Sequence, residues 1–197
     1  MEQFNQGYIE VVCGPMFAGK TEELIRRIKR LEYANKKYLV FKPQIDSRYS
    51  KVEIVSHNNN RKEAINVKKA SEILKYITID IDVVIIDEAQ FFDFEIVKVA
   101  DYLADQGKRV IIGGLDRDFK GDPFGPMPYL LAIAEQVTKL SAICVKTGLN
   151  ATRTQRIIND HPAKIDDPIV MIGAKESYEP RCRIKHEVPG KKYEFDI

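Results

Sequence analysis

The segment at residues 14–21 constrains the fold of this chain more than any other part of it. Its sequence, GPMFAGKT, satisfies the pattern G-x-x-x-x-G-K-[ST] at every fixed position. A β-branched run at 8–13 precedes it, and an amphipathic helical pattern at 21–35 follows it. Because glycines let backbone N–H groups turn inward at the start of a helix, this context predicts a phosphate-binding loop.

Residues 14–21 would supply the groups that bind the phosphates of a nucleoside triphosphate. Lys20 is expected to reach the β- and γ-phosphates, and the Thr21 hydroxyl is expected to coordinate Mg²⁺. The partial positive charge at the N-terminus of the following helix adds to the attraction. We therefore expect ATP to contact all eight residues of the loop: Gly14, Pro15, Met16, Phe17, Ala18, Gly19, Lys20 and Thr21.

Two adjacent carboxylates, Asp87 and Glu88, follow an apolar run and so stand at the C-terminal end of an expected strand. Ligands of open α/β sheets bind at this edge. Asp87 is expected to hold Mg²⁺ directly or through water, and Glu88 to accept a proton from the attacking group. Ala89 and Gln90 complete the segment and are also expected to lie beside the nucleotide. The residues alone leave open whether Glu88 activates water, as in an ATPase, or a hydroxyl, as in a kinase.

Apolar runs alternate with amphipathic patterns from residue 8 to about residue 142. The expected strands cover 8–13, 38–41, 82–86 and 109–115, and the expected helices cover 21–35, 94–106 and 128–135. Strands that are apolar on both faces and alternate with helices form a mainly parallel sheet with helices on both sides. We therefore expect an α/β domain of the P-loop type over residues 1–142.

Two regions depart from this alternation. Residues 43–62 are expected to form a long polar loop, and loops of this length in a compact domain are commonly functional. After residue 142, short β-prone pieces at 151–158 and 168–172 indicate a small β-rich domain over 143–189. Residues 190–197 are expected to be a flexible tail.

Composition excludes several classes of protein. Hydrophobic residues make up 44% and charged residues 30% of the 197, which is typical of a folded globular protein. The net charge of +2 is too balanced to indicate nucleic acid or a membrane surface as a partner. No apolar run is long enough to span a bilayer, and the N-terminus lacks the apolar core of a signal peptide. Three cysteines are too few for a disulfide framework, so a cytoplasmic protein is expected.

Several aromatic and charged residues lie in segments expected to adjoin the phosphate site. Phe91, Phe119 and Phe124 could stack on a flat base, although aromatics near a sheet edge also serve as core residues. Arg48 could stabilise a phosphate and Asp46 could contact a ribose, although either could be a simple surface charge. The residues alone leave both interpretations open.

Cys144 and Cys182 flank the expected small domain, like two corners of a structural zinc site. Such a site needs a second ligand three positions after each cysteine. Here these positions hold Thr147 and Lys185. Threonine is a poor zinc ligand and a protonated lysine has no free lone pair, so tight zinc binding is not expected.

Seven segments carry a resemblance to a known family: GPMFAGKT (14–21), DSRYS (46–50), VSHN (55–58), DEAQFF (87–92), LDRDFKGDPFG (115–125), TRTQR (152–156) and IGAKESYEPRCR (172–183). Together, these segments resemble the type II thymidine kinases, which combine a P-loop core with a small lasso domain. They occur in the family's order and cover roughly residues 8–189.

The resemblance implies transfer of the γ-phosphoryl group of Mg-ATP to the 5′-hydroxyl of thymidine in deoxynucleotide salvage, with deoxyuridine as a second substrate. Glu88 would accept the proton of that hydroxyl, and Lys20 and Arg48 would stabilise the transferring phosphoryl group. The resemblance also implies a cytoplasmic homotetramer that dTTP inhibits.

The same resemblance assigns the nucleoside site to the P-loop, the aromatic segments and the lasso, residues 143–189. The lasso would close over the base and bind it largely through main-chain groups. The implied nucleoside contacts are Met16, Asp46, Phe91, Leu115, Phe119, Phe124, Thr154, Ile169, Val170, Met171, Ile172, Gly173 and Tyr178.

One departure from the family concerns zinc. Relatives of this kind carry a four-ligand zinc site in the lasso, at the positions that match Cys144, Thr147, Cys182 and Lys185. Because two ligands are missing, we expect a lasso without zinc, held by packing, its β-ladder and subunit contacts. Recruitment of His186 as a third ligand is the alternative.

Three other functions remain as alternatives. The sequence DEAQ resembles the acidic box of nucleic-acid-dependent ATPases, but those need a second domain for which this chain has little room. A non-catalytic P-loop regulator would not need Glu88. A nucleoside kinase with another base preference would differ only in its response to a panel of nucleosides.

Overall fold

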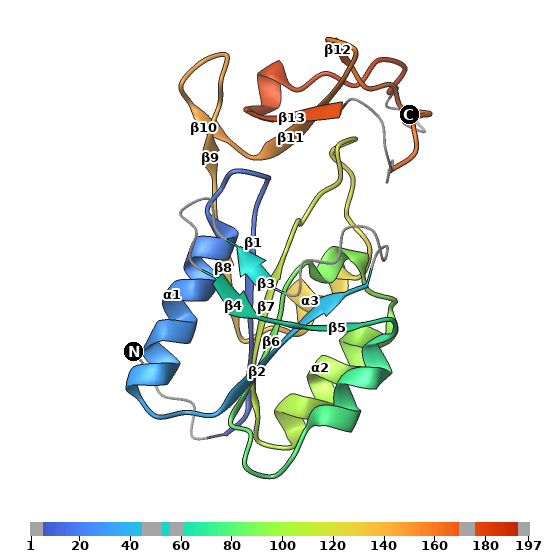
Figure 1. Cartoon of the computed structure of the whole chain (residues 1–197). Helices are drawn as coiled ribbons and strands as arrows, with labels where there is room; N and C mark the ends of the chain where they lie inside the picture. The colour runs from blue at the N-terminus through green and yellow to red at the C-terminus, as the bar shows by residue number, and fades with distance from the viewer. Residues whose placement is uncertain (1–5, 45–52, 56–60, 170–175, 193–197) are drawn as a thin grey trace.

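A six-stranded parallel sheet forms the centre of the computed structural model, which describes residues 6–44, 53–55, 61–169 and 176–192 (Figure 1). The strand order is β5-β2-β6-β7-β1-β8, and each neighbouring pair is parallel. The strands are β1 (Tyr8–Cys13), β2 (Tyr38–Pro43), β5 (Ile65–Val67), β6 (Val83–Ile86), β7 (Arg109–Gly114) and β8 (Gln136–Lys139). This arrangement confirms the expected α/β fold of the P-loop type.

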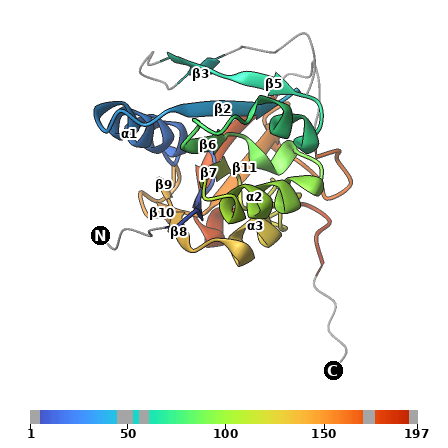
Figure 2. The same cartoon turned by 90° about the horizontal axis from the view of Figure 1, so that it is seen from below.

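Helices cover both faces of the sheet, because successive strand residues point to opposite sides. On one face, α1 (Lys20–Tyr33) buries Leu24, Ile25, Ile28 and Leu31 against Val12, Ile85 and Ile111 of the sheet. On the other face, α2 (Glu95–Asp105), α3 (Met127–Ile133) and the 3₁₀ helix η1 (Ala70–Tyr76) pack on Val11, Val84, Ile86 and Ile112. Figure 2 shows α1 on the opposite side of β6 and β7 from α2 and α3.

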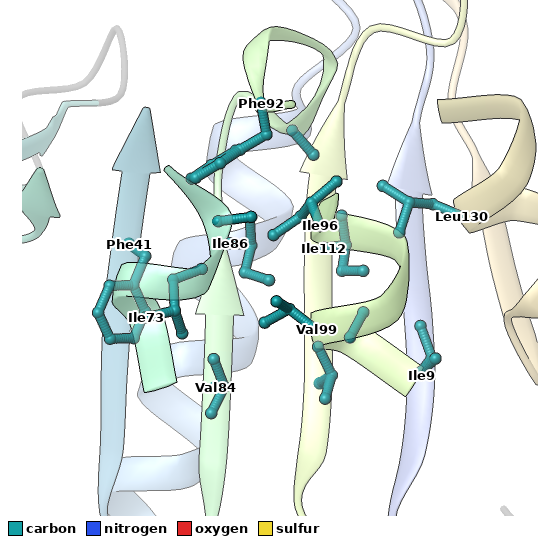
Figure 3. Packing of buried hydrophobic residues seen from close by; sticks show 14 of the residues in the cluster. Ile9, Phe41, Ile73, Val84, Ile86, Phe92, Ile96, Val99, Ile112 and Leu130 are labelled. Carbon is teal, nitrogen blue, oxygen red and sulfur yellow. The ribbon is translucent and has the colours of Figure 1, made fainter. Parts of the chain in front are cut away.

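The core against α2 is built from interlocking aliphatic side chains (Figure 3). Ile96 and Val99 of α2 pack against Ile86 and Ile112 of the two central strands, and all four are almost fully buried. The spacing of apolar residues along α2 therefore matches the face that it presents to the sheet. This packing holds the carboxyl ends of β6 and β7 in fixed positions.

Small antiparallel sheets follow the parallel sheet in the chain and lie beyond its carboxyl edge (Figure 1). Strands β9 (Ala142–Ile143) and β10 (Asn150–Ala151) form a hairpin. Strand β11 (Arg153–Ile158) lies between β12 (His161–Pro162) and β13 (Glu176–Arg181), and the 3₁₀ helix η3 (Arg183–Lys185) follows. The division into domains at residue 142 stays a prediction.

Several local expectations were wrong. The interval 43–62 is not one polar loop, because β3 (Glu53–Val55) pairs with β4 (Arg61–Glu63). The edge strands β5 and β8 were not predicted, since β5 has three residues and β8 is mostly exposed and polar. Pro168 and Ile169 lie outside any strand, and the rest of the expected β-prone piece at 168–172 lies outside the described residues.

Part of the C-terminal segment makes defined contacts with the rest of the structure. Lys191, in the segment expected to be flexible, donates from Nζ to Lys120 O and to the Asp122 carboxylate, both at 2.6 Å. Residues 193–197 lie outside the described residues.

Among the helices of the described ranges, none has the length and apolar character of a membrane span.

Candidate active site

The P-loop joins β1 to α1 and requires glycine at both of its fixed glycine positions. Gly14 has a φ of 146°, and a Cβ there would lie 2.5 Å from the carbonyl oxygen of Leu140. Gly19, with a φ of 83°, directly precedes α1. The structure thus places the motif between a strand and a helix as the sequence predicted, with the first N–H groups of α1 at the loop.

Lys20 lies within the loop and among carboxylates. Its Nζ donates to the carbonyl oxygen of Pro15 at 2.8 Å. Burial lowers the pKa of Lys20, and the nearby charges of Glu88, Asp87 and Asp116 oppose this effect, Glu88 most strongly. The ammonium group is therefore close to the acidic residues at the ends of β6 and β7.

Asp87 follows β6 and is almost fully buried. It accepts the N–H of Glu88 at 2.9 Å and forms an ion pair with Lys42 Nζ at 3.3 Å. Strand β7 separates β6 from β1, and Gly113 on β7 makes room beside the carboxylate. A Cβ at Gly113 would lie 2.6 Å from Leu24 Cδ1 and 3.3 Å from Asp87 Oδ1.

Glu88 and Gln90 form a hydrogen-bonded pair at the end of β6. Glu88 has a φ of 54°, a conformation that non-glycine residues rarely adopt. Burial raises the pKa of Glu88, Asp87 raises it further, and the hydrogen bond from Gln90 Nε2 at 2.5 Å opposes both. Gln90 Oε1 accepts the N–H of Leu115 at 2.9 Å, and the side chain is 2% exposed. Gln90, expected beside ATP, thus connects Glu88 to the segment after β7.

The residues expected to hold Mg²⁺ offer oxygen donors. Thr21 lies in the first turn of α1, and the Asp87 carboxylate ends β6. A hydroxyl and one carboxylate fit Mg²⁺, which commonly takes one or two protein oxygens together with phosphate oxygens and water. Within the described ranges, no group of three or more His, Cys, Asp and Glu side chains is arranged to hold a metal ion.

Two of the expected base-stacking aromatics lie together. The Phe91 and Phe124 rings are 5.3 Å apart between centroids and meet edge to face. The third, Phe119, is 5% exposed, and the guanidinium of Arg156 lies 5.0 Å from its ring centroid. Phe119 is therefore packed under a cation of β11 rather than open to solvent.

The β11 strand also contacts the P-loop directly. Thr154 is 4% exposed, and its Oγ1 accepts the N–H of Met16 at 3.0 Å. Tyr178 on β13 pairs in register with Arg156 and is partly buried. This places two segments expected to contact a nucleoside, far apart in the chain, at the same edge of the sheet.

Other expected site residues lie apart from these contacts or beyond what is described. Ile169 is 42% exposed and lies next to Pro168, whose carbonyl accepts a hydrogen bond from Arg156. The expected site residues outside the described ranges are Asp46, Arg48, Val170, Met171, Ile172 and Gly173.

Asp116 was missed by the sequence reasoning. It is 6% exposed, follows β7 and forms an ion pair with Lys139 Nζ at 2.8 Å. The signal that identified Asp87, a carboxylate directly after an apolar strand, was also present at Asp116. Arg156 is fully buried and was missed as well, because nothing in its local pattern distinguishes it from an exposed strand residue.

The four positions expected to correspond to zinc ligands hold two thiols, a hydroxyl and a lysine. Cys144 and Cys182 are buried, and Thr147 Oγ1 lies 3.5 Å from Cys182 Sγ. Burial raises the pKa of Cys144, but hydrogen bonds from Thr147 and from the backbone outweigh it and bring the pKa to about 6. Two thiols, a hydroxyl and a lysine do not match the sulfur and imidazole ligands of structural zinc.

His186, the alternative third ligand, is engaged elsewhere. Its Nε2 donates to the carbonyl oxygen of Phe119 at 2.8 Å. Burial lowers the pKa of His186, and this hydrogen bond opposes the effect. The imidazole therefore connects η3 to the loop that carries Phe119.

Comparison with known families agrees with this geometry. The family model described as thymidine kinase matches residues 7–186. The match spans the P-loop, the acidic segment after β6, the Phe119 loop and the antiparallel sheets, and it confirms the resemblance seen in the sequence. This chain belongs to the thymidine kinase family.

Proposed function

We propose that this chain transfers the γ-phosphoryl group of ATP to the 5′-hydroxyl of thymidine and of deoxyuridine. The family makes the chain a kinase that phosphorylates thymidine. The proposal adds the ATP donor, the residues that act and the second substrate. The products would be ADP and the nucleoside monophosphate, which supplies deoxynucleotide salvage.

The observation that carries the mechanism is that the P-loop lysine and a strand-end carboxylate lie at the same edge of the parallel sheet, since Lys20 follows β1 and Glu88 follows β6. Among the charges that act on Lys20, that of Glu88 is the strongest. An anion bound in the P-loop would therefore have a proton acceptor beside it. In a kinase, that acceptor faces the hydroxyl that attacks the terminal phosphate.

Glu88 is proposed as the general base. Burial of the carboxyl, and then the charge of Asp87, raise its pKa above that of an ordinary carboxyl. A higher pKa makes the ionised carboxylate a stronger base toward the proton of the attacking hydroxyl. Gln90 orients the carboxylate through its hydrogen bond at 2.5 Å.

The cations would stabilise the charge of the transferring phosphoryl group. Phosphoryl transfer depends mainly on positioning and on charge stabilisation. Lys20 and Arg48 are proposed for this role, and Thr21 and Asp87 would hold Mg²⁺. When bound, Mg²⁺ neutralises charge on the phosphates and helps to align them.

The nucleoside is proposed to bind between the aromatic segments and the lasso, residues 143–189. The edge-to-face pair of Phe91 and Phe124 and the hydrogen bond between Thr154 and Met16 support this location. Phe119, Leu115 and Tyr178 would complete the described part of the pocket. Asp46 and the main chain at 169–173 are proposed as further nucleoside contacts.

The proposal extends to assembly and regulation on the basis of the resemblance. We propose a cytoplasmic homotetramer, inhibited by dTTP, whose lasso holds no zinc. The exposed aromatic pair of Phe94 and Tyr129, with ring centroids 5.7 Å apart, offers an apolar surface of the kind that interfaces cover.

The decisive experiment is a product assay with labelled ATP, Mg²⁺ and a panel of nucleosides. We expect dTMP from thymidine, dUMP from deoxyuridine, and no product when Mg²⁺ is chelated. Preference for a purine nucleoside would contradict the substrate assignment. ATP hydrolysis that responds to DNA or RNA but not to thymidine would contradict the kinase assignment.

A further inference from the structure

The C-terminal strap, defined here as residues 187–191, lies beyond the residues that the family model matches. It nevertheless makes specific contacts with two parts of the described structure. One is the preceding part of the lasso, at Gln155 and Ile165, and the other is the loop at 116–124 that carries Phe119 and Phe124.

The backbone of the strap is held on the lasso side by hydrogen bonds to the Gln155 side chain and to the Ile165 backbone. Gln155 of β11 is 1% exposed, and its amide both donates to Glu187 O and accepts the N–H of Glu187, each at 2.8 Å. The N–H of Ile165 donates to Pro189 O at 3.0 Å. These contacts determine the path of the strap before it reaches Lys191.

A glycine turn then directs Lys191 toward the loop. Gly190 has a φ of 87°, and a Cβ there would lie 2.9 Å from Ile165 Cγ2. The N–H of Lys191 donates to Val188 O at 3.0 Å, which closes the turn. The turn therefore needs glycine for its conformation and for its close approach to Ile165.

Lys191 contacts the loop through a mostly buried ammonium group. Its side chain is 17% exposed, and Nζ lies 2.6 Å from both Lys120 O and an Asp122 carboxylate oxygen. His186 donates to the preceding carbonyl, that of Phe119, at 2.8 Å. Two consecutive backbone carbonyls at the tip of the loop are thus held by side chains from the C-terminal part of the chain.

The loop itself is a compact unit that such contacts can move or hold as a whole. Asp118 accepts the N–H groups of Lys120 and Asp122 at 2.8 and 3.0 Å. Arg117 and Pro123 form an isolated antiparallel bridge at its base. Holding the tip of the loop therefore also sets the positions of Phe119, which lies between Arg117 and Pro123 in the sequence, and of Phe124, which follows Pro123.

We infer that Lys191 is a positioning residue for nucleoside binding, which holds the 116–124 loop against the lasso so that its phenylalanines face the nucleoside. The inference rests on the proposed function, in which Phe119 and Phe124 contact the nucleoside. The Lys191 ammonium contacts the loop that carries these phenylalanines, so we expect its effect to fall on the nucleoside more than on ATP.

The test compares Lys191→Met with Lys192→Met, a change at the exposed neighbouring lysine. For Lys191→Met we expect the KM for thymidine to rise about threefold to tenfold, because a charge-assisted hydrogen bond to a half-exposed partner is lost. The kcat and the KM for ATP should stay within about twofold. Lys192→Met should match the wild type in all three constants.

A second measurement does not depend on turnover. Hydrogen exchange of the amides at 116–124 should become faster in Lys191→Met than in Lys192→Met, because the loop tip has lost its anchor. Asp122→Asn should also raise the KM for thymidine. If both residues act through one ion pair, the double variant should be little worse than Lys191→Met alone.

The outcomes separate this inference from the proposed function. A wild-type enzyme that makes no dTMP overturns the proposed function and with it the role inferred for Lys191. An active wild type with an unchanged thymidine KM in Lys191→Met overturns the inference alone. Equal increases in the KM for thymidine and for ATP also overturn it, since they indicate a general structural role.

Discussion

At the scale of single residues, the acidic segment after β6 combines two demands on one carboxylate. Glu88 is half-buried, and desolvation of its carboxyl together with the charge of Asp87 raises its pKa, yet a general base must be ionised to accept a proton. Gln90 and Lys20 favour the ionised form and oppose the effect of burial. The site thus keeps a carboxylate that is harder to ionise than usual but still stabilised in its charged state.

Replacing Glu88 with glutamine should separate catalysis from stability. We expect Glu88→Gln to lower kcat by about 10²–10⁴, the usual effect of losing a general base, with ATP binding largely retained. Steady-state kinetics and ATP titration measure the two effects. Nearly normal turnover would show that another group accepts the proton.

The same variant should unfold at a temperature no lower than the wild type at neutral pH. The raised pKa of Glu88 means that the folded state favours the protonated carboxyl, so ionisation above that pKa costs stability. A neutral amide removes this cost. Thermal unfolding at pH 5 and pH 8 should show a larger advantage for Glu88→Gln at the higher pH.

Gln90 should tune the pH dependence of the reaction. Its hydrogen bond lowers the pKa of Glu88, so Gln90→Leu should raise that pKa. Because the ionised carboxylate is the active form, the acid limb of the kcat/KM profile should move to higher pH. Gln90→Glu is less suitable, since it adds a charge. An unshifted profile with reduced kcat would mean that Gln90 acts only on structure.

At the scale of elements, a buried ion network joins α1 to the central sheet. Glu10 of β1 is 3% exposed and pairs with Arg27 of α1 and Arg109 of β7. Arg27 also donates to Thr138 of β8 at 2.9 Å. The buried carboxylate on the P-loop strand therefore connects this strand to α1 and β7, and Arg27 extends the network to β8.

Removing the charge of Glu10 should destabilise the fold. We expect Glu10→Gln to lower the free energy of unfolding by about 2 kcal/mol, because it leaves Arg109 without its carboxylate and leaves Arg27 paired with Glu23 alone. Asp80→Asn, which disrupts an exposed pair with Lys37, is the matched control and should have little effect. Urea denaturation measures both, and equal small effects would show that the network adds no stability.

The turns that carry Cys144 and Cys182 are closed by backbone hydrogen bonds of their own. Gly148 N–H donates to Cys144 O at 2.8 Å, and Lys185 N–H donates to Cys182 O at 3.1 Å. The local backbone is thus organised around the two thiols. The Thr147 hydroxyl lies 3.5 Å from Cys182 Sγ, at a position where the resemblance implies a zinc ligand in relatives.

Zinc content should depend on the residues at 147 and 185. Dialysed, untagged wild-type protein should contain far less than one zinc per chain by elemental analysis. The double variant Thr147→Cys and Lys185→Cys should bind about one, since it completes a four-thiolate set. About one zinc per chain in the wild type would contradict this, and would implicate a ligand such as His186.

At the scale of the whole molecule, contacts from the C-terminal third build one side of the proposed site. Thr154 bonds to the P-loop, Arg156 covers Phe119, and Lys191 holds the loop at 116–124. The parallel sheet alone therefore does not supply all the residues of the proposed nucleoside site. Binding of the nucleoside and the position of the lasso should be coupled.

The proposed assembly is testable by mass. Light scattering after size exclusion should give four times the chain mass of 22.6 kDa, with no monomer on moderate dilution. The same measurement with thymidine and dTTP would show whether ligands change the assembly. A single species of one chain mass would contradict the tetramer.

Much of the fold was predictable because its signals are local. The P-loop pattern, the apolar strands and the amphipathic helices are each contained in a short window of sequence. The strands β5 and β8 and the β3–β4 pair were not predicted, since short or exposed strands lack a periodic apolar pattern. Their existence depends on neighbours that the sheet provides.

The sequence by itself determined the phosphate-binding loop, the acidic pair and the family, because these depend on residue types at fixed spacing. Only the tertiary structure decided that Gln90 links Glu88 to Leu115, that Thr154 meets Met16, and that Lys191 reaches Asp122. The physical reason is that each of these contacts joins a side chain to a segment whose position the folded chain sets. A short-range sequence pattern carries no information about such tertiary contacts, which form only when the sheet and the lasso pack together.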